Sequence, residues 1–278
     1  MSQQGPPQDA VRKLPVFQTV VEAYGKVFNN LSSLVKAATL PFAISLGISF
    51  MTQTDAVSLE RLVLVNALNL LPETYFGVAW IRFVLLGAAQ ATPTNLSPIL
   101  PRHLHFLRFA AFMMLLTMPP LLGMLIEYQP VMEVQGPPSP ELLAEVATNL
   151  MPFMALLIVA LLLVLRFSFV FPAVAVDEAY GLAESWRHTR GQLIRMIVGL
   201  AIAMIPMVIA SLILGATLSS GASGSPSLGF LIMSTAFSYV VLALYFAFIA
   251  IAFRECTGWI SGEPAGSFGP EHEEEGEV

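Results

Sequence analysis

A carboxylate stands inside an apolar stretch of the chain, where charge is unusual. Glu73 lies twelve residues after Arg61 and nine before Arg82, with mostly apolar residues on either side. At about 1.5 Å of rise per residue, a helix would place it near the middle of a bilayer. Asn66 and Asn69 share its helical face, at spacings of three and four residues. Because a carboxylate at that depth must be neutral, paired or hydrated, Glu73, Asn66 and Asn69 predict an intramembrane polar site.

The role of this site stays open between two interpretations. In the first, Glu73 is a functional group, either a proton or cation site or an anchor for a transported substrate. In the second, Glu73 is neutral, and its hydrogen bond to another helix fixes the packing. A span that began at Pro72 would instead move Glu73 to the outer interface. We prefer the first register, because Arg82 then closes its span as Arg166 and Arg254 close theirs.

A second group of polar residues lies between two apolar runs, in RFSFVFPAVAVDEAYGLAESWRHTRGQ. Its segment 181–193 has an amphipathic pattern, with Leu182, Trp186, Thr189 and Leu193 on one helical face. Such a helix lies in the membrane interface, with Arg and Trp at the level of the headgroups. The residues expected to bind a lipid headgroup or a partner are Arg166, Trp186, Arg187, His188 and Arg190.

A similar segment, 19–31, precedes the first apolar run. Thr19 and Glu22 have the spacing of a capping box, in which a hydroxyl and a carboxylate bond the first N–H groups of a helix. Gly181 and Glu184 repeat that spacing, and Gly is an acceptable N-cap. Both segments therefore predict interfacial helices that begin at Thr19 and Gly181.

Other chemistry is poorly supported by the sequence. His103 and His105 are two residues apart, so on a helix they point away from each other and cannot share a metal ion. The only cysteine, Cys256, is distant from them, so the spacing of a zinc site is missing. Phosphate-binding glycine loops and a glycine-flanked nucleophilic serine are missing from the sequence. We therefore expect no enzyme activity, no metal, no cofactor and no nucleic-acid partner.

The elements that position these residues are membrane spans. The chain is 56% hydrophobic and only 12% charged, against about 25% charged residues in soluble domains. Six segments approach the twenty or so apolar residues that a spanning helix requires. They are 33–52, 62–82, 106–127, 146–166, 196–218 and 228–252. The expected fold is an all-α, polytopic bundle of six transmembrane helices with interfacial amphipathic helices on the cytoplasmic face.

The expected organisation has three parts. A polar segment, 1–15, does not have the pattern of a signal peptide. The membrane domain covers 16–260, and proline falls inside five of its six spans. A tail, 261–278, carries six Glu and no Lys or Arg, which is typical of a disordered segment.

The distribution of Lys and Arg predicts the topology. Of the thirteen basic residues, only Arg61 falls on the opposite side when the spans alternate in direction. Cytoplasmic loops retain basic residues, so both termini are expected in the cytoplasm. Arg82, Arg166 and Arg254 also recur at intervals of 84 and 88 residues, which suggests three degenerate helical hairpins.

The segments LRFSFVFPAVAVDEAYGLAESWRHTRGQLIR, VAWIRFVLLGAA and LPVFQTVVEAYGKVFNNL resemble signatures of an uncharacterised group of small proteobacterial six-helix inner-membrane proteins. The matching residues in the first segment are Arg166, Pro172, Asp177, Ser185, Trp186, Thr189, Arg190 and Gly191. More remotely, the chain is similar to YciC-type proteins and to the membrane domain of some glycerophosphodiester phosphodiesterases, whose catalytic domain has no counterpart here. The resemblance implies a fold and a bacterial inner-membrane location, and it brings no activity with it.

Together these observations favour a non-enzymatic inner-membrane protein that organises lipid or a partner protein. It would act in envelope maintenance or as an accessory subunit of a larger membrane complex. The expected partners are membrane lipids, with another membrane protein as an open alternative. The competing interpretation is a small transporter or lipid-translocating protein built around Glu73, Asn66 and Asn69.

Overall fold

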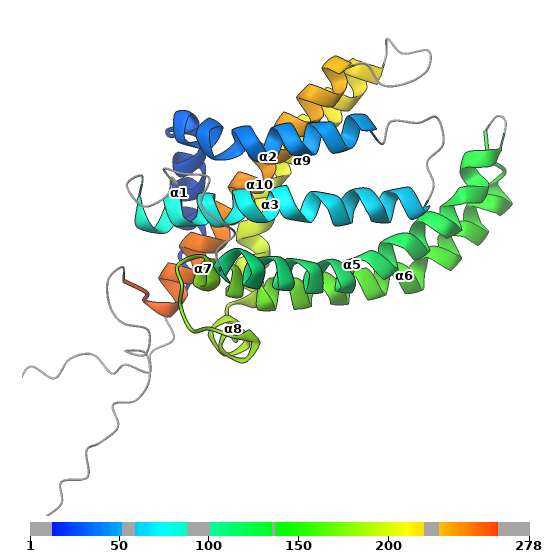
Figure 1. Ribbon diagram of the computed structural model, residues 1–278. Coiled ribbons are helices and arrows are strands. Elements are labelled where there is room, and N and C mark those ends of the chain that lie inside the picture. Colours follow the sequence, from blue (N-terminus) through cyan, green and yellow to red (C-terminus); the bar gives the residue numbers. More distant parts are fainter. Residues whose placement is uncertain (1–12, 52–58, 88–100, 135–136, 220–227, 261–278) are drawn as a thin grey trace, which may run out of the picture.

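The computed structural model describes residues 13–51, 59–87, 101–134, 137–219 and 228–260. The acidic tail and residues 1–12 of the polar N-terminal segment lie outside the described residues. Within the described ranges the regular structure is helical (Figure 1). This confirms the all-α fold.

Six of the helices are long and apolar enough to cross a membrane, so the chain is a multi-pass membrane protein. Each covers one expected span to within a residue. They are α2 (Leu31–Met51), α3 (Leu59–Leu86), α5 (Pro101–Glu133), α6 (Pro140–Phe167), α9 (Leu193–Ser219) and α10 (Leu228–Thr257). The helices continue through their internal prolines, and Pro72 therefore lies inside α3 rather than at its start. Glu73 accordingly falls near the middle of this helix.

The spans pack as three antiparallel hairpins, α2–α3, α5–α6 and α9–α10 (Figure 1). Helix α10 lies at the centre, because 61% of its most apolar window is buried against 11–28% in the other five spans. It contacts α1, α2, α3, α7 and α9. The fold is therefore a set of hairpins arranged around one central helix.

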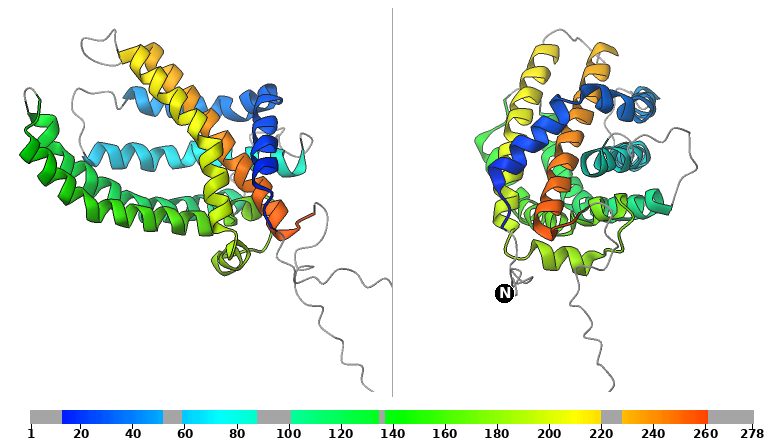
Figure 2. Two further views of the ribbon diagram at one scale, coloured as in Figure 1. Left: turned by 180° about the vertical axis from the view of Figure 1, so that it is seen from behind. Right: turned by 90° about the vertical axis from the view of Figure 1, so that its left-hand side faces the viewer.

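Three shorter helices gather at one end of the bundle. They are α1 (Val16–Phe28), α7 (Val170–Ala175) and α8 (Leu182–Thr189). Helices α1 and α8 run across the direction of the spans (Figure 2). Arg166 and Arg254 stand in the last turns of α6 and α10, and Arg82 lies four residues before the end of α3. We call this the basic end, and the opposite end of the bundle the far end.

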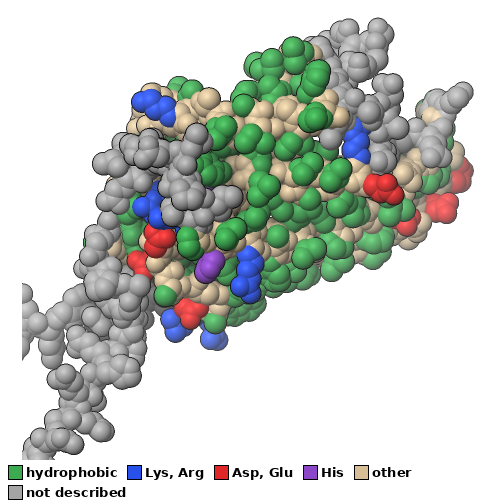
Figure 3. Space-filling model, viewed as in Figure 1, with side chains coloured by type: hydrophobic (Ala, Val, Ile, Leu, Met, Phe, Trp, Pro, Cys, Tyr) green, Lys and Arg blue, Asp and Glu red, His purple; other side chains and the backbone are tan. Residues whose placement is uncertain are grey.

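Charged side chains lie at the two ends of the bundle, with both signs at the basic end (Figure 3). Lys and Arg side chains gather at the basic end, a wide hydrophobic band covers the spans, and acidic side chains mark the far end (Figure 3). Glu60, Glu141 and Glu145 are exposed there, near the first turns of α3 and α6. This is the pattern of a protein whose apolar band lies in the bilayer.

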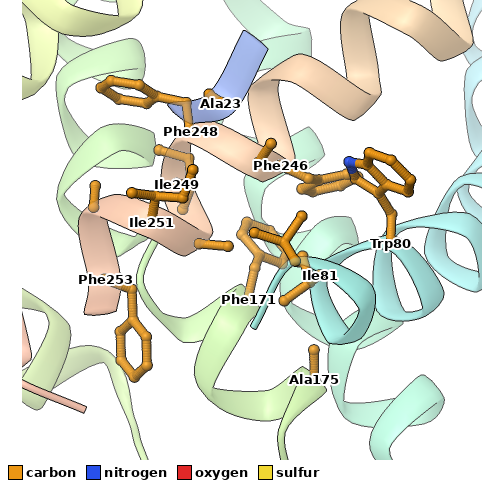
Figure 4. Close-up of a cluster of buried hydrophobic side chains, with 14 of the residues drawn as sticks. Ala23, Trp80, Ile81, Phe171, Ala175, Phe246, Phe248, Ile249, Ile251 and Phe253 are labelled. Atoms are coloured by element: carbon orange, nitrogen blue, oxygen red, sulfur yellow. The ribbon is translucent and has the colours of Figure 1, made fainter. Parts of the chain in front are cut away.

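The buried core lies toward the basic end rather than in the middle of the spans. It is made mainly by the second halves of α3 and α10 together with α7 (Figure 4). The indole of Trp80 is fully buried and donates to the carbonyl of Ala243 at 2.9 Å, which joins α3 to α10. Toward the far end, the α9–α10 hairpin diverges from α5 and α6 (Figure 2). The bundle is thus closed at one end and splayed at the other.

The start of the first interfacial helix differs from our expectation. Helix α1 begins at Val16, with Pro15 as its N-cap, so Thr19 is inside the helix. The Thr19 hydroxyl donates to the carbonyl of Pro15 at 3.0 Å, and Glu22 pairs with Arg254 at 2.9 Å. The predicted capping box at Thr19 and Glu22 is therefore wrong. Proline is favourable next to a helix start, and here it moves that start upstream.

Candidate functional site

Helix α8 is attached to the end of α6 through its small polar residues. The hydroxyl of Ser185 donates to the carbonyl of Arg166 at 2.7 Å, and that of Thr189 donates to the same oxygen at 3.2 Å. Both residues are fully buried. Because they stand four residues apart, they define one helical face. The opposite face, with Arg187, is turned outward.

This arrangement corrects the expected apolar face of the segment 181–193. The helix ends at Thr189, and Gly191, with a φ of 81°, turns the chain into α9 at Leu193. Thr189 points into the protein, whereas Trp186 is 45% exposed. Leu193 belongs to another helix, so the four residues do not form one face. A glycine in the left-handed conformation directly after the last turn commonly ends a helix. The hydrophobic periodicity of the sequence does not indicate this end.

The arginine and tryptophan at this site are in direct contact. The Arg166 guanidinium lies over the Trp186 ring, 4.7 Å from its centre, and the ring of Phe167 is 5.9 Å away. Such cation–π contacts orient both partners. One nitrogen of Arg166, Nη1, is buried and has no hydrogen-bond partner. Arg187 and Arg190 are exposed beside this pair.

His188 and Glu184 hold the loop that precedes α8. The Glu184 carboxylate accepts the N–H of Gly181 at 2.9 Å, which confirms its predicted capping role. Bonds from backbone N–H groups, its own and that of Gly181, lower the pKa of Glu184. His188 Nδ1 lies 2.9 Å from the Tyr180 hydroxyl, and the two rings stack at 5.7 Å. Burial, with Arg187 nearby, lowers the pKa of His188, and burial raises that of Tyr180.

Asp177 joins three helices, a role that the sequence did not reveal. Its carboxylate lies 2.7 Å from Arg102 of α5 and 3.3 Å from Arg82 of α3. Arg82 also donates to the carbonyl of Ala175 at 2.8 Å. Asp177 has a φ of 65°, a left-handed conformation that Asp tolerates better than most residues. The sequence contained one signal for this role of Asp177. It was an acidic turn directly after an apolar segment, in a chain whose spans end or begin near arginine.

Helix α1 is held on the same end by contacts with α9 and α10. The N–H of Leu14 donates to Gln192 at 3.1 Å, and the Tyr24 hydroxyl donates to the carbonyl of Ala203 at 2.8 Å. Its outer face is apolar, with Phe17 74% and Val21 70% exposed. A helix that crosses the direction of the spans and exposes large apolar residues is suited to the membrane interface.

Glu73 lies at the middle of α3, fourteen residues after its first residue and thirteen before its last. It is exposed to a cavity of about 370 Å³ between α3, α5 and α10. Asn66 lines the same cavity, whereas Asn69 is not among the lining residues. Both amides donate to carbonyls of their own helix, those of Leu62 and Val65. The structure thus brings two of the three predicted residues together.

The histidines and the cysteine have structural surroundings. His103 stacks on Tyr75 at 5.1 Å, and His105 is exposed. Cys256 is buried. Within the described ranges, no group of three His, Cys, Asp or Glu residues is placed to hold a metal ion.

Comparisons with protein-family models, with curated proteins and with solved structures found no match. Inference about function therefore starts from the geometry of the basic end and of the cavity.

Proposed function

We propose that this chain is a non-enzymatic protein of the bacterial inner membrane that organises anionic lipid, or a partner protein, at its basic end. One observation carries the proposal. Helices α1 and α8 both run across that end, and α8 exposes Arg187 and Arg190 beside Trp186 (Figure 2). The resemblance to YciC-type proteins is part of this proposal.

The residues at this surface suit lipid headgroups. Arg187 and Arg190 form none of the ion pairs found within the described part of the chain. A basic residue at an anionic membrane surface contributes about 1 kcal/mol. Tryptophan prefers the headgroup level, and Phe17 and Val21 of α1 supply exposed apolar area at the same end. The same surface is available to an acidic partner protein, which would make the chain an accessory subunit or a factor in envelope maintenance.

The test measures the lipid around the protein in reconstituted bilayers. Spin-labelled phosphatidylglycerol should associate more strongly than spin-labelled phosphatidylcholine. Replacing Arg187→Ala or Arg190→Ala should each reduce that preference, by up to about fivefold in the association constant. Arg61→Ala is the matched control, because it removes one arginine from the far end. An unchanged preference in the Arg187→Ala, Arg190→Ala double variant would refute lipid organisation at this surface.

The cavity supports a second candidate function, transport or translocation of a lipid through the bundle. Its supporting observation is Glu73, a carboxylate at the middle of a span that faces an open volume rather than packed side chains. In vesicles that contain a fluorescent phosphatidylglycerol, Glu73→Gln should abolish exchange between leaflets. Exchange at the rate of the unmodified protein would count against this candidate and leave the headgroup surface untouched.

A further inference from the structure

The cavity at Glu73 combines a mostly apolar lining with a few polar groups, most of them on α3. Its polar residues, besides Tyr245, are Asn66, Glu73 and Thr74 of α3 and Thr117 of α5. The remaining lining residues are Leu70, Phe106, Ala110, Met113, Met114, Met118, Leu121, Val164, Phe171 and Phe246. Lys, Arg and His do not occur in this lining. The charge of Glu73 is therefore not balanced from within the cavity.

The polar groups of the cavity include oxygens that can accept hydrogen bonds from a ligand. The Asn66 amide donates to the carbonyl of Leu62 at 2.8 Å, and the Thr117 hydroxyl donates to that of Met113 at 3.1 Å. One N–H of Asn66 and the hydroxyl of Thr117 are thus used within their own helices. The amide oxygen of Asn66 and the carboxylate of Glu73 remain as acceptors. A ligand head that brings N–H donors can therefore bond to these oxygens.

Thr74 is an independent sign of a ligand. It lines the cavity, is 4% exposed, and its hydroxyl has no hydrogen-bond partner. Other helical threonines satisfy themselves by donating to the carbonyl four residues earlier, as Thr39, Thr117, Thr148 and Thr257 do. Buried polar groups are rarely left unsatisfied, and an unsatisfied one next to a cavity needs an explanation.

The shape and composition limit the class of ligand. At about 370 Å³, the cavity is at the small end of the range for ligand sites, about 300–1,000 Å³. It suits one hydrocarbon chain better than the two chains of a phospholipid. Met113, Met114 and Met118 form a flexible, polarisable wall that adapts to such a chain. A carboxylate at mid-bilayer depth is favourable only when it is paired, and among the described residues none forms an ion pair with Glu73.

We propose that this cavity binds a single-chain amphiphile with a primary ammonium head. The ammonium pairs with the carboxylate of Glu73 and donates a hydrogen bond to the hydroxyl of Thr74. The hydrocarbon chain lies along the methionine wall of α5. The inference concerns the same cavity as the transport candidate, but it needs binding only and holds whether or not the amphiphile crosses the membrane.

The experiment measures equilibrium binding of radiolabelled dodecylamine to the full chain in phosphatidylcholine nanodiscs, with empty nanodiscs as the background. Unlabelled dodecylamine should displace the label. Dodecanol, which has the same chain without the charge, should not displace it. Dodecyltrimethylammonium, which has the charge without a donor, should displace it at least about tenfold less well. This panel uses the unmodified protein, so it does not depend on the folding of any variant.

Variants then locate the site. Glu73→Gln should weaken dodecylamine binding at least about tenfold, and Thr74→Val, which keeps the shape, should weaken it by about threefold to tenfold. Asn69→Leu is the matched control, because Asn69 is on the same helix and outside the cavity lining, and it should bind as the unmodified protein does. Each variant is compared only after its thermal unfolding midpoint has been shown to match that of the unmodified protein.

The possible failures are distinct. Equal displacement by dodecanol, or unchanged binding in Glu73→Gln, would overturn the proposed site. Equal displacement by dodecyltrimethylammonium would overturn the hydrogen bond to Thr74. Dodecylamine binding without leaflet exchange of phosphatidylglycerol would uphold the site and refute the transport candidate. The arginine variants could also lose the preference for phosphatidylglycerol and still bind dodecylamine. That result would show that the lipid surface at the basic end and the cavity at Glu73 act independently.

Discussion

Arginines at the basic end differ in what they contact. Arg82 and Arg102 are tied to Asp177, and Arg254 pairs with Glu22 and Glu255. These contacts connect α3, α5, α10 and α1, so their first effect is to hold the short helices and the spans together. Ion pairs that are partly shielded from water contribute more than exposed ones, which are worth about 0–1 kcal/mol. Arg187 and Arg190 are exposed instead, which is why the lipid test is directed at them.

His188 gives the basic end a dependence on pH. Burial first, and then the neighbouring Arg187, lower its pKa, so the folded protein binds this proton at a lower pH than the unfolded chain does. The stability that depends on neutral His188 is therefore complete above the ordinary pKa of about 6.5 and is lost as the pH falls below it. We expect the unfolding midpoint in detergent to decrease when the pH is lowered from 7 to 5.5.

The control for this prediction is His188→Gln, which keeps a polar side chain and does not titrate. The midpoint of the variant should fall less over the same interval, by a small margin because His188 is only half-buried. The two proteins otherwise have the same ionisable residues, so the remaining pH effects largely cancel in the difference. Parallel curves for the two proteins would show that His188 is not the group responsible.

Some residue roles followed from the sequence and others did not. The cap of Glu184 depends on spacing within one helix and was predicted correctly. Glu73 lies at the middle of its helix, and its depth in the bilayer stays a prediction. Asp177 and Thr74 depend on what other helices bring next to them, which spacing does not encode. The capping box at Thr19 failed because Pro15 starts the helix earlier. Local chemistry was thus readable, and tertiary contacts were not.

At the scale of elements, hydropathy located all six spans because each must bury its backbone in lipid on its own. The same rule does not apply to the segments between spans. Helix α7 is short, and the chain then turns at Asp177 toward α8. Periodicity therefore overestimated the length of the second interfacial helix, which stops at Thr189.

Gly77 controls the close packing of α3 against α10. A Cβ at this position would lie 2.8 Å from Phe246 and 2.9 Å from Phe106. Those rings are wedged against each other and against Phe171, at centroid distances of 5.8, 6.3 and 4.8 Å, so they have little room to move. Gly77→Ala should therefore lower the free energy of unfolding by about 1–3 kcal/mol, as overpacking of a core does.

Gly47 offers a matched control for this prediction. It also lies inside a span, α2, but a Cβ there would have no neighbour within 4 Å. Gly47→Ala should leave stability unchanged or raise it by about 0.5–1 kcal/mol, because alanine has the better helix propensity. Both variants are measured by loss of helical circular dichroism in a denaturing detergent titration. A Gly77→Ala protein as stable as Gly47→Ala would contradict the proposed close packing.

For the whole molecule, packing and charge share one axis. The buried aromatic core, the ion pairs and the interfacial helices are all at the basic end, while the hairpins diverge toward the far end (Figures 1 and 2). The cavity at Glu73 lies where the closed half of the bundle gives way to the splayed half. The basic end is therefore the closely packed base from which the spans diverge (Figure 2).

The same axis predicts how the protein lies in its membrane. Translocated segments lose Lys and Arg, and Arg61 is the one basic residue expected on the far side, so the basic end should face the cytoplasm. In a Cys256→Ser background, Glu141→Cys places an exposed thiol near the far end and Arg187→Cys places one at the basic end. A membrane-impermeant maleimide added to intact spheroplasts should label the first protein at once and the second only after the membrane has been opened. Lys13→Cys and Gln129→Cys form a second exposed pair, which should repeat the pattern if it reflects topology rather than one local environment. Labelling of the basic-end cysteines in intact spheroplasts would reverse the topology and move the proposed lipid surface to the outer leaflet.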